Sequence, residues 1–227
     1  MSISVFFYAI PQMLGGIAIT FQLLLLSLFI GTLVAIILLL MRISGRWWLS
    51  WLAQVYTYVF RGTPILVQIF IVYYGLPQFE WIRGSIFWPI LRDPFGCAVL
   101  ALSLNLGAYA SEIFRGGVLA VERGLVEAGA ALGMSPSQRF IYITSPLAIR
   151  ICLPAYGNEI ISLMKSTALA STITLIDMTG IARTIVAETF APYQVFLSLA
   201  LVYVILTWII QTTIKRLEDY LGRHTVR

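Results

Sequence analysis

Two charged side chains interrupt an otherwise uncharged stretch of this sequence, where they could bind a polar or charged ligand. Glu159 and Lys165 are the only charged residues between positions 151 and 176. An α-helix turns once every 3.6 residues, so spacings of three, four and seven residues bring side chains to one face. Five polar side chains share such a stripe: Asn158, Glu159, Ser162, Lys165 and Ser166. A carboxylate in this stripe is suited to receive an ammonium or guanidinium group.

Two further polar residues lie in other apolar stretches. Arg61 lies between positions 51 and 76, and Asn105 lies between positions 94 and 119. Under the functional hypothesis, six residues line a substrate path: Glu159, Asn158, Ser162, Lys165, Asn105 and Arg61.

A structural alternative for these residues stays open. Glu159 could pair with Arg61 or Lys165 and hold a helix bundle together. For Arg61 itself we favour a structural or gating role, and Asn105 could join helices through amide hydrogen bonds.

The sequence contains no pattern that predicts catalysis or a resident cofactor. It lacks the GxxxxGK[ST] phosphate loop, HExxH and GxSxG, and its one histidine, His224, lies in a polar tail. Its two cysteines, Cys97 and Cys152, do not form a CxxC or Cys/His cluster. We therefore predict no catalytic residue, no metal site and no cofactor in this chain.

The composition excludes a water-soluble globule. Of the 227 residues, 59% are hydrophobic and only 11% are charged, and the mean hydropathy is +0.90. A soluble domain has roughly 25% charged residues. A charge at the centre of a membrane helix costs on the order of 2.5 to 3.5 kcal/mol, so the few that remain there usually mark a polar path.

The apolar stretches predict an all-α integral membrane protein with one transmembrane domain over residues 1–227. Five stretches are long enough to cross a bilayer, which takes about 20 helical residues. The predicted helices are residues 14–41, 51–76, 94–119, 151–176 and 193–214.

The basic residues predict the orientation of the chain, because Lys and Arg accumulate in short cytoplasmic loops. Only Arg83, Arg92 and Arg183 fall on the opposite side. We therefore expect the N-terminus outside the cell and the C-terminus inside, in the cytoplasm. Ten basic residues fall on the cytoplasmic side: Arg42, Arg46, Arg115, Arg123, Arg139, Arg150, Lys215, Arg216, Arg223 and Arg227.

The cytoplasmic segment 120–150 is predicted to form two short helices. Gly133 suits the left-handed residue that closes a helix, and the run from Ser135 to Gln138 has the form of a capping box that starts the next one. Such a loop either docks on a partner protein or lies on the lipid headgroups as an interfacial helix.

Several motifs in this sequence resemble one family. Glu127-Ala128-Gly129 followed by Gly133 resembles the EAA loop of bacterial ABC importer permeases. The motifs at 61–64, 101–117 and 153–171 resemble the polar amino-acid branch of that family, the histidine, arginine and octopine type. The sequence departs from the family pattern where Gly129 replaces the second Ala and where Ser145 precedes Pro146.

The resemblance implies the five-helix permease fold with a cytoplasmic coupling helix. It also implies that the loop docks on a separate ATPase subunit, and we assign Glu127, Ala128, Gly133 and Ser135 to that contact. In the family, the periplasmic region that corresponds to 171–192 helps to close the outer gate and meets a soluble binding protein.

On this resemblance the chain is expected to be the permease subunit of a binding-protein-dependent, ATP-driven amino-acid importer in the bacterial inner membrane. Its expected partners are two copies of an ATP-binding subunit, which hold the ATP and Mg, an identical or homologous permease, and a periplasmic binding protein. The run from Ser166 to Ala170 resembles permeases for basic amino acids and opines.

Two other functions fit the composition. The chain could form an ATP-independent channel or secondary transporter that oligomerises, or it could be a structural protein of a membrane assembly.

Overall fold

The computed structural model describes residues 3–222, and helices make up nearly all of this range, with no β-strand in it. Four helices are long and apolar enough to cross a membrane, and a bent pair of helices gives a fifth crossing if the pair counts as one span. The prediction of an all-α membrane protein is confirmed. The predicted basic tail at Arg223, His224 and Arg227 lies outside the described residues.

The first span is longer at its N-terminal side than the predicted 14–41. It comprises α1 (Ile3–Met13), a 3-10 turn at Leu14–Gly16 and α2 (Ile17–Ile43). Gly16 lies at the joint because a Cβ there would stand 2.5 Å from the backbone of Asp177 and Met178. Only glycine permits the later segment to approach this closely.

The predicted span 51–76 is not one continuous helix. It is divided into α3 (Trp47–Gly62) and α4 (Ile65–Phe70), which belong to two helical stretches set at 104° to one another. Pro64 excludes the preceding residue from the helical conformation, and Thr63 is accordingly extended, at φ −115° and ψ 142°. After α4 the chain continues as a π-helical turn at Ile71–Gly75 and a 3-10 turn at Leu76–Gln78.

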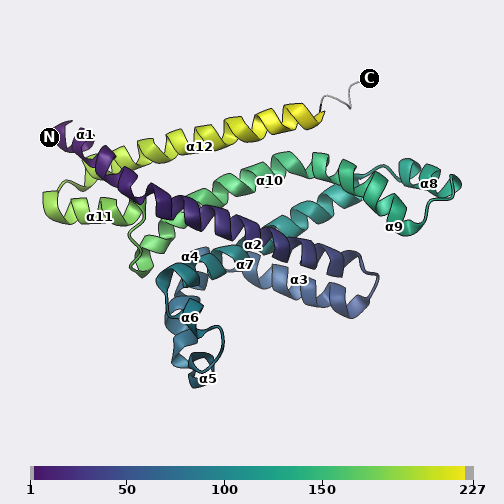
Figure 1. The fold of residues 1–227 in the computed structure, drawn as a ribbon, viewed down its shortest axis with the longest axis horizontal. Helices are drawn as coiled ribbons and strands as arrows, with labels where there is room; N and C mark the ends of the chain where they lie inside the picture. Colours follow the sequence, from purple (N-terminus) through teal and green to yellow (C-terminus); the bar gives the residue numbers. More distant parts are fainter. Residues whose placement is uncertain (1–2, 223–227) are drawn as a thin grey trace.

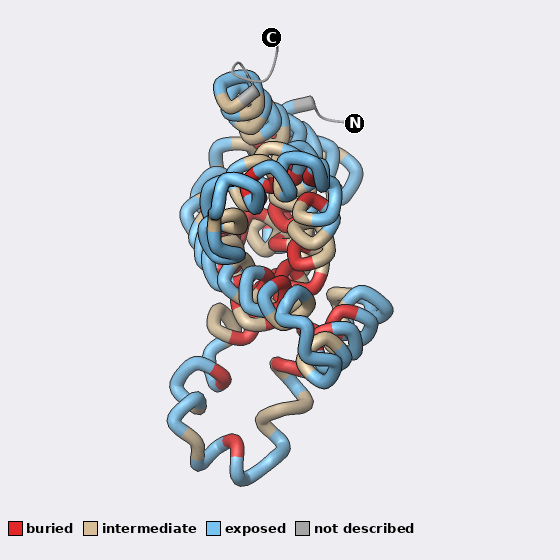
Figure 2. The backbone as a smooth tube through the Cα atoms, turned by 90° about the vertical axis from the view of Figure 1, so that its right-hand side faces the viewer, coloured by how far each residue is buried: buried red, intermediate tan, exposed pale blue. Residues whose placement is uncertain are grey.

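A mostly exposed segment projects from the helices at this point and carries the short helices α5 (Glu80–Arg83) and α6 (Trp88–Leu91) (Figures 1 and 2). The following helix, α7 (Pro94–Ala120), begins where the Asp93 carboxylate accepts a hydrogen bond from the Gly96 N–H at 3.2 Å. Glycines let α7 pack closely on α2, because a Cβ at Gly31 would lie 2.7 Å from Leu106 Cδ2.

The segment after α7 contains the two predicted short helices, α8 (Arg123–Ala131) and α9 (Pro136–Arg139). The capping box at Ser135 is formed: its hydroxyl accepts from the Gln138 N–H, and the Gln138 side chain accepts from the Ser135 N–H. Gly133 has a φ of +80°, as a left-handed helix-closing residue requires.

The last part of the chain contains three longer helices. A π-helical turn at Phe140–Thr144 leads into α10 (Ser145–Thr167), which starts and ends earlier than the predicted 151–176. A 3-10 turn at Ala168–Ile173 leads to α11 (Met178–Thr189), and α12 (Pro192–Gly222) follows.

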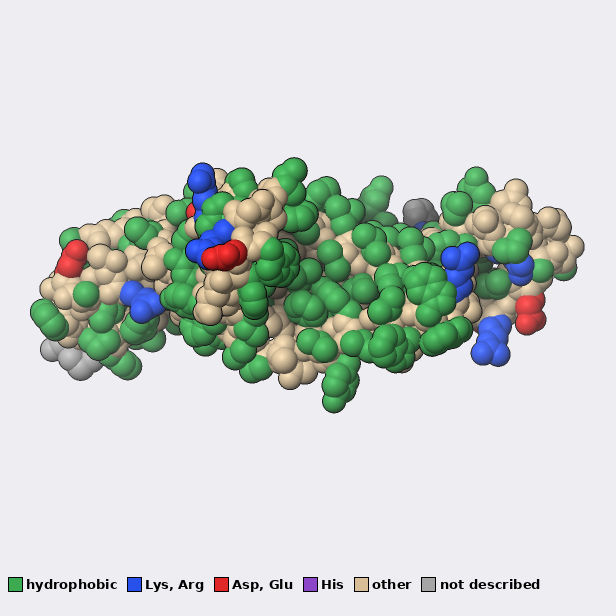
Figure 3. Space-filling view, turned by 90° about the horizontal axis from the view of Figure 1, so that it is seen from below, with side chains coloured by type: hydrophobic (Ala, Val, Ile, Leu, Met, Phe, Trp, Pro, Cys, Tyr) green, Lys and Arg blue, Asp and Glu red, His purple; other side chains and the backbone are tan. Residues whose placement is uncertain are grey.

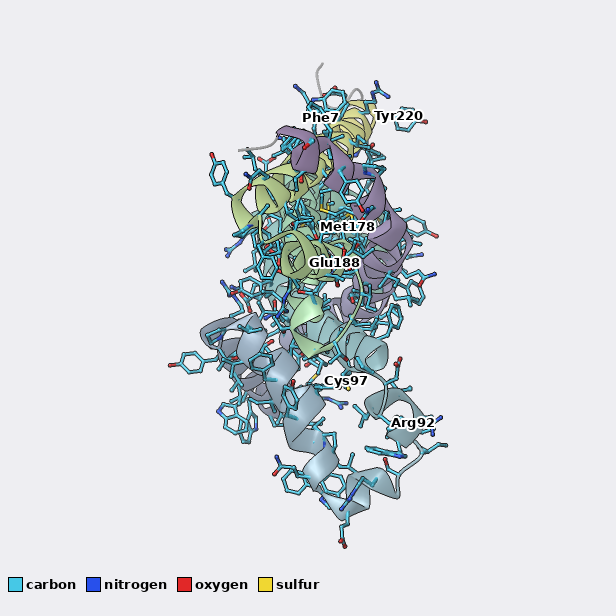
Figure 4. All side chains as sticks on the ribbon, turned by 90° about the vertical axis from the view of Figure 1, so that its left-hand side faces the viewer. Phe7, Arg92, Cys97, Met178, Glu188 and Tyr220 are labelled. Carbon is cyan, nitrogen blue, oxygen red and sulfur yellow. The ribbon has the colours of Figure 1, made fainter. Side chains whose placement is uncertain are left out.

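The helices form an elongated molecule in which α8 and α9 lie at one end and α11 lies at the opposite end (Figure 1). Buried residues concentrate where α2, α7 and α10 meet (Figure 2). Hydrophobic side chains cover the middle of the face in Figure 3, and charged ones gather toward α8 and α9 and on the projecting segment. Figure 4 shows Cys97 at the start of α7, near the projecting segment that carries Arg92.

Candidate functional site

A cavity of about 380 Å³ lies where the break between α3 and α4 faces α7 and α10. The break contributes five consecutive residues, Arg61 to Ile65, and α7 contributes Asn105 and Tyr109. From α10 come Glu159, Ser162 and Ser166. Residues from three distant parts of the sequence therefore meet in one polar cavity inside the predicted membrane region.

The two opposite charges in this cavity do not form a direct ion pair. Within residues 3–222, no ion pair joins Glu159 to Arg61 or to Lys165. The Arg61 guanidinium instead lies over the ring of Tyr109, with 5.2 Å between its central carbon and the ring centroid. The Tyr109 hydroxyl donates a hydrogen bond to the Arg61 carbonyl at 3.4 Å. Both charged groups thus border the same space, and Tyr109 supports Arg61.

The predicted stripe on α10 divides between two sides of the helix. At 100° per residue, Ser162, Ser166 and Glu159 span a sector of about 60°, and all three line the cavity. Asn158 lies outside that sector and lines a separate pocket of about 250 Å³ between α10 and α12. Lys165 lies beyond Asn158 on the same side and is exposed. Helical periodicity places these five residues in one stripe. The elements packed around α10 differ along that stripe, so the five residues do not all face the same cavity.

Asn105 and Gln68 meet beside the cavity. The Asn105 amide donates to the Gln68 side-chain oxygen at 3.0 Å and to the Phe60 carbonyl at 3.3 Å. Gln68, Thr63 and Tyr109 are not among the residues that the sequence predicts to line the path. Gln68 could have been recognised from the sequence, because it is a polar amide within an apolar run and lies four residues after a proline.

The predicted docking residues of the cytoplasmic loop lie on an open surface. Glu127, Ala128, Gly133 and Ser135 are all exposed. Gly129, where the sequence departs from the family pattern, is buried, and a Cβ there would stand 2.6 Å from the end of the Ile143 side chain. The departure is therefore consistent with close packing of α8 on the turn before α10.

A buried carboxylate lies at the opposite end of the molecule, outside the long helices. Asp177 caps α11, with Oδ1 accepting from the Gly180 N–H at 2.9 Å. Its other oxygen, Oδ2, is buried and has no hydrogen-bond partner among the described residues. Burial raises the pKa of Asp177 from 3.8 to about 6, although hydrogen bonds from Gly180 and Thr179 oppose the shift.

The chain is similar to named proteins over most of its length. It is 48% identical to the octopine transport system permease protein OccM of Rhizobium meliloti, covering 87% of this chain and 80% of that protein. It is 41% identical to the nopaline permease NocM of Agrobacterium fabrum, covering 99% and 93%. It is 40% identical to the histidine/lysine/arginine/ornithine permease HisM of Escherichia coli K12, covering 92% and 88%.

Solved structures agree with these relatives. A crystal structure of an amino acid ABC transporter with histidines matches with a TM-score of 0.83 at 33% identity, covering 92% of this chain and 94% of that one. The MetNI methionine ABC transporter, at 19% identity and a TM-score of 0.70, shares the fold. These comparisons confirm the permease fold and the resemblance inferred from the motifs.

The family model for the binding-protein-dependent transport system inner membrane component matches residues 27–227. That range includes the break between α3 and α4, the α8–α9 loop and the whole of α10. The chain therefore belongs to the family of binding-protein-dependent transport system inner membrane components.

Proposed function

We propose that this chain is the permease subunit of an ATP-driven importer for basic amino acids or opines, and that it forms half of the translocation path. The main support for this substrate class is the cavity that Glu159 and Arg61 both line without forming an ion pair with each other. A basic amino acid carries a cationic side chain and a carboxylate, so it matches the two charges. The names of OccM, NocM and HisM support the same class of substrate.

The proposed binding set is Glu159, Asn158, Ser162, Lys165, Asn105 and Arg61. Glu159, Ser162, Asn105 and Arg61 border the cavity in this chain. We place Asn158 and Lys165 on the flank of the path, where a second permease, identical or homologous, would complete it. The path then opens alternately to the two sides of the membrane.

The α8–α9 loop is the proposed contact with the ATPase. We assign this docking to Glu127, Ala128, Gly133 and Ser135, whose exposure is compatible with it. Two ATP-binding subunits would hold ATP and Mg and move the loops when they close. A periplasmic binding protein would deliver the substrate to the opposite end of the molecule.

The proposed location is the bacterial inner membrane, with a periplasmic N-terminus and a cytoplasmic C-terminus. The excess of Lys and Arg around the loop supports this orientation. In Figure 1, the end of α12 points toward the side of the molecule that carries α8 and α9. The single transmembrane domain over 1–227 is part of the same proposal.

The test is the ATPase activity of the assembly in lipid, with its ATPase subunit and binding protein, across cationic, polar and acidic amino acids. We expect stimulation by arginine, lysine, histidine or octopine, and loss of most of it in Glu159→Gln. Glu80→Gln is the matched control, because Glu80 is an exposed residue of α5 on the projecting segment, outside both the cavity and the 171–192 region. Activity that no ligand changes would contradict the importer, and a fully stimulated Glu159→Gln variant would contradict the site.

A further inference from the structure

The break between α3 and α4 leaves backbone groups that a continuous helix would satisfy. The last four carbonyls of a helix have no partner within it, and hydrocarbon offers no water to replace that partner. The break therefore needs donors from side chains if it is to keep its shape.

Gln68 supplies two donor hydrogens to this break. Its amide nitrogen lies 2.8 Å from the Phe60 carbonyl, 3.1 Å from the Thr63 carbonyl and 2.7 Å from the Thr63 hydroxyl oxygen. The residue is buried, with 6% of its surface exposed. Gln68 belongs to α4 and its acceptors belong to the end of α3 and the break, so the side chain joins the two helices across the bend.

The partners also fix the orientation of the Gln68 carboxamide. Carbonyl oxygens only accept, so the nitrogen must face Phe60 and Thr63. The Thr63 hydroxyl donates its one proton to the Val59 carbonyl at 2.8 Å, so its oxygen can only accept from Gln68, whose two amide hydrogens are shared among three acceptors. The Gln68 oxygen is left to accept from Asn105 on α7 at 3.0 Å. One side chain thus ties α3, α4 and α7 together.

We propose that Gln68 is a positioning residue for the substrate site, which holds the break in the shape that turns Arg61, Gly62 and Thr63 toward Glu159. Gln68 itself is not among the residues that line the cavity, whereas the segment that it holds forms one wall of it. The residue acts through the backbone and not by contact with the ligand. The inference rests on the proposed function, because it concerns the same site.

The test measures binding of radiolabelled arginine, lysine, histidine and octopine to the purified permease–ATPase assembly without the binding protein. Gln68→Met removes both amide hydrogens and keeps the volume. Gln68→Glu keeps the shape and the acceptor for Asn105 but turns an oxygen toward two carbonyls. Gln78→Met is the matched control, because exposed Gln78 donates only to the Tyr74 carbonyl of its own stretch, at 3.1 Å.

We expect both Gln68 variants to bind the ligand at least tenfold more weakly, with a thermal unfolding midpoint within a few degrees of that of the unchanged protein. Gln78→Met should bind normally. Normal affinity in either folded Gln68 variant would overturn the inference. A ligand affinity and a thermal unfolding midpoint that both fall in both Gln68 variants would also overturn the inference, because that result indicates a merely structural role.

The two proposals fail in different ways in this experiment. If the unchanged assembly binds none of the four ligands, the proposed substrate site is wrong, and the positioning role falls with it. If the unchanged assembly binds a ligand and the Gln68 variants bind it equally well, only the positioning role is wrong.

Discussion

Glu159 and Arg61 border one cavity without pairing, and this separation is what makes the cavity suitable for a zwitterion with a cationic side chain. Tyr109 contributes to the separation, because the Arg61 guanidinium lies on its ring. Glu112, farther along α7, is engaged elsewhere: it pairs with Arg115 at 2.8 Å and with Arg42 at 3.4 Å. Both of these ion pairs of Glu112 are formed outside the cavity that Glu159 borders.

Asp177 gives a prediction for the pH dependence of stability. Burial raises the pKa of Asp177 in the folded chain to about 6 from its ordinary value of 3.8, so the folded state binds the proton more tightly. The stability from this group is complete below about pH 3.8 and is lost as the pH rises through about 6. A pKa difference of this size corresponds to on the order of 3 kcal/mol at most.

Asp177→Asn stays neutral at every pH and can still accept from the Gly180 N–H. We expect its unfolding midpoint to change less between pH 5 and pH 8 than that of the unchanged protein. Asp93→Asn is the control, because Asp93 caps α7 in an exposed position and should leave the pH dependence as it was. Equal pH dependence in the Asp177 variant would contradict the prediction.

At the scale of the elements, α8 and its turn form a rigid projection with an exposed outer surface. Gly133 and the capping box fix the angle between α8 and α9, and Gly129 lets α8 lie close to the Phe140–Thr144 turn. The turn continues directly into α10, which carries Glu159. A displacement of the α8–α9 loop would therefore act directly on α10, the helix that carries Glu159 to the cavity.

Glu127→Ala tests whether this projection couples the chain to an ATPase. We expect ligand-stimulated transport to fall at least tenfold, because an exposed carboxylate at the proposed docking surface is removed. Glu122→Ala, at the exposed start of α8, is the matched control and should retain most of the activity. The measurement is uptake into proteoliposomes that contain ATP. An ATP-independent channel would transport equally well in both variants and without ATP.

At the scale of the whole molecule, the face in Figure 3 has charged side chains toward its ends and on the projecting segment, and hydrophobic side chains over its middle. Such a surface suits lipid, because hydrocarbon offers no hydrogen bonds to exposed polar groups. The projecting segment with α5 and α6 and the loop with α8 and α9 lie on different parts of this elongated body (Figure 1).

Labelling of single introduced cysteines tests the orientation of the molecule. Glu80→Cys lies on the projecting segment and Ser137→Cys lies on α9, and both positions are exposed. We expect a membrane-impermeant maleimide to label position 80 in intact cells and position 137 only after permeabilisation. The native thiols Cys97 and Cys152 are buried, so their background should be low. The reverse pattern would contradict a cytoplasmic loop.

The sequence by itself determined the membrane class and the permease family, and it predicted the two short helices of the loop. These properties follow from composition, from local capping chemistry and from motifs contiguous in the chain, so a linear sequence is enough to detect them. Glu159 was found for the same reason, because a charge in an apolar run is visible without a fold.

Only the tertiary structure decided which polar residues share a cavity. The sequence placed Asn158 and Glu159 in one stripe, but α12 packs beside one and the α3–α4 break beside the other. It predicted one span at 51–76 in which Gly62 and Pro64 allow a local break, but it did not predict the bend of 104°, across which Gln68 bonds to Thr63 and to Asn105 from α7. Periodicity describes one helix, whereas a site depends on which neighbours each face meets, and long-range packing fixes that.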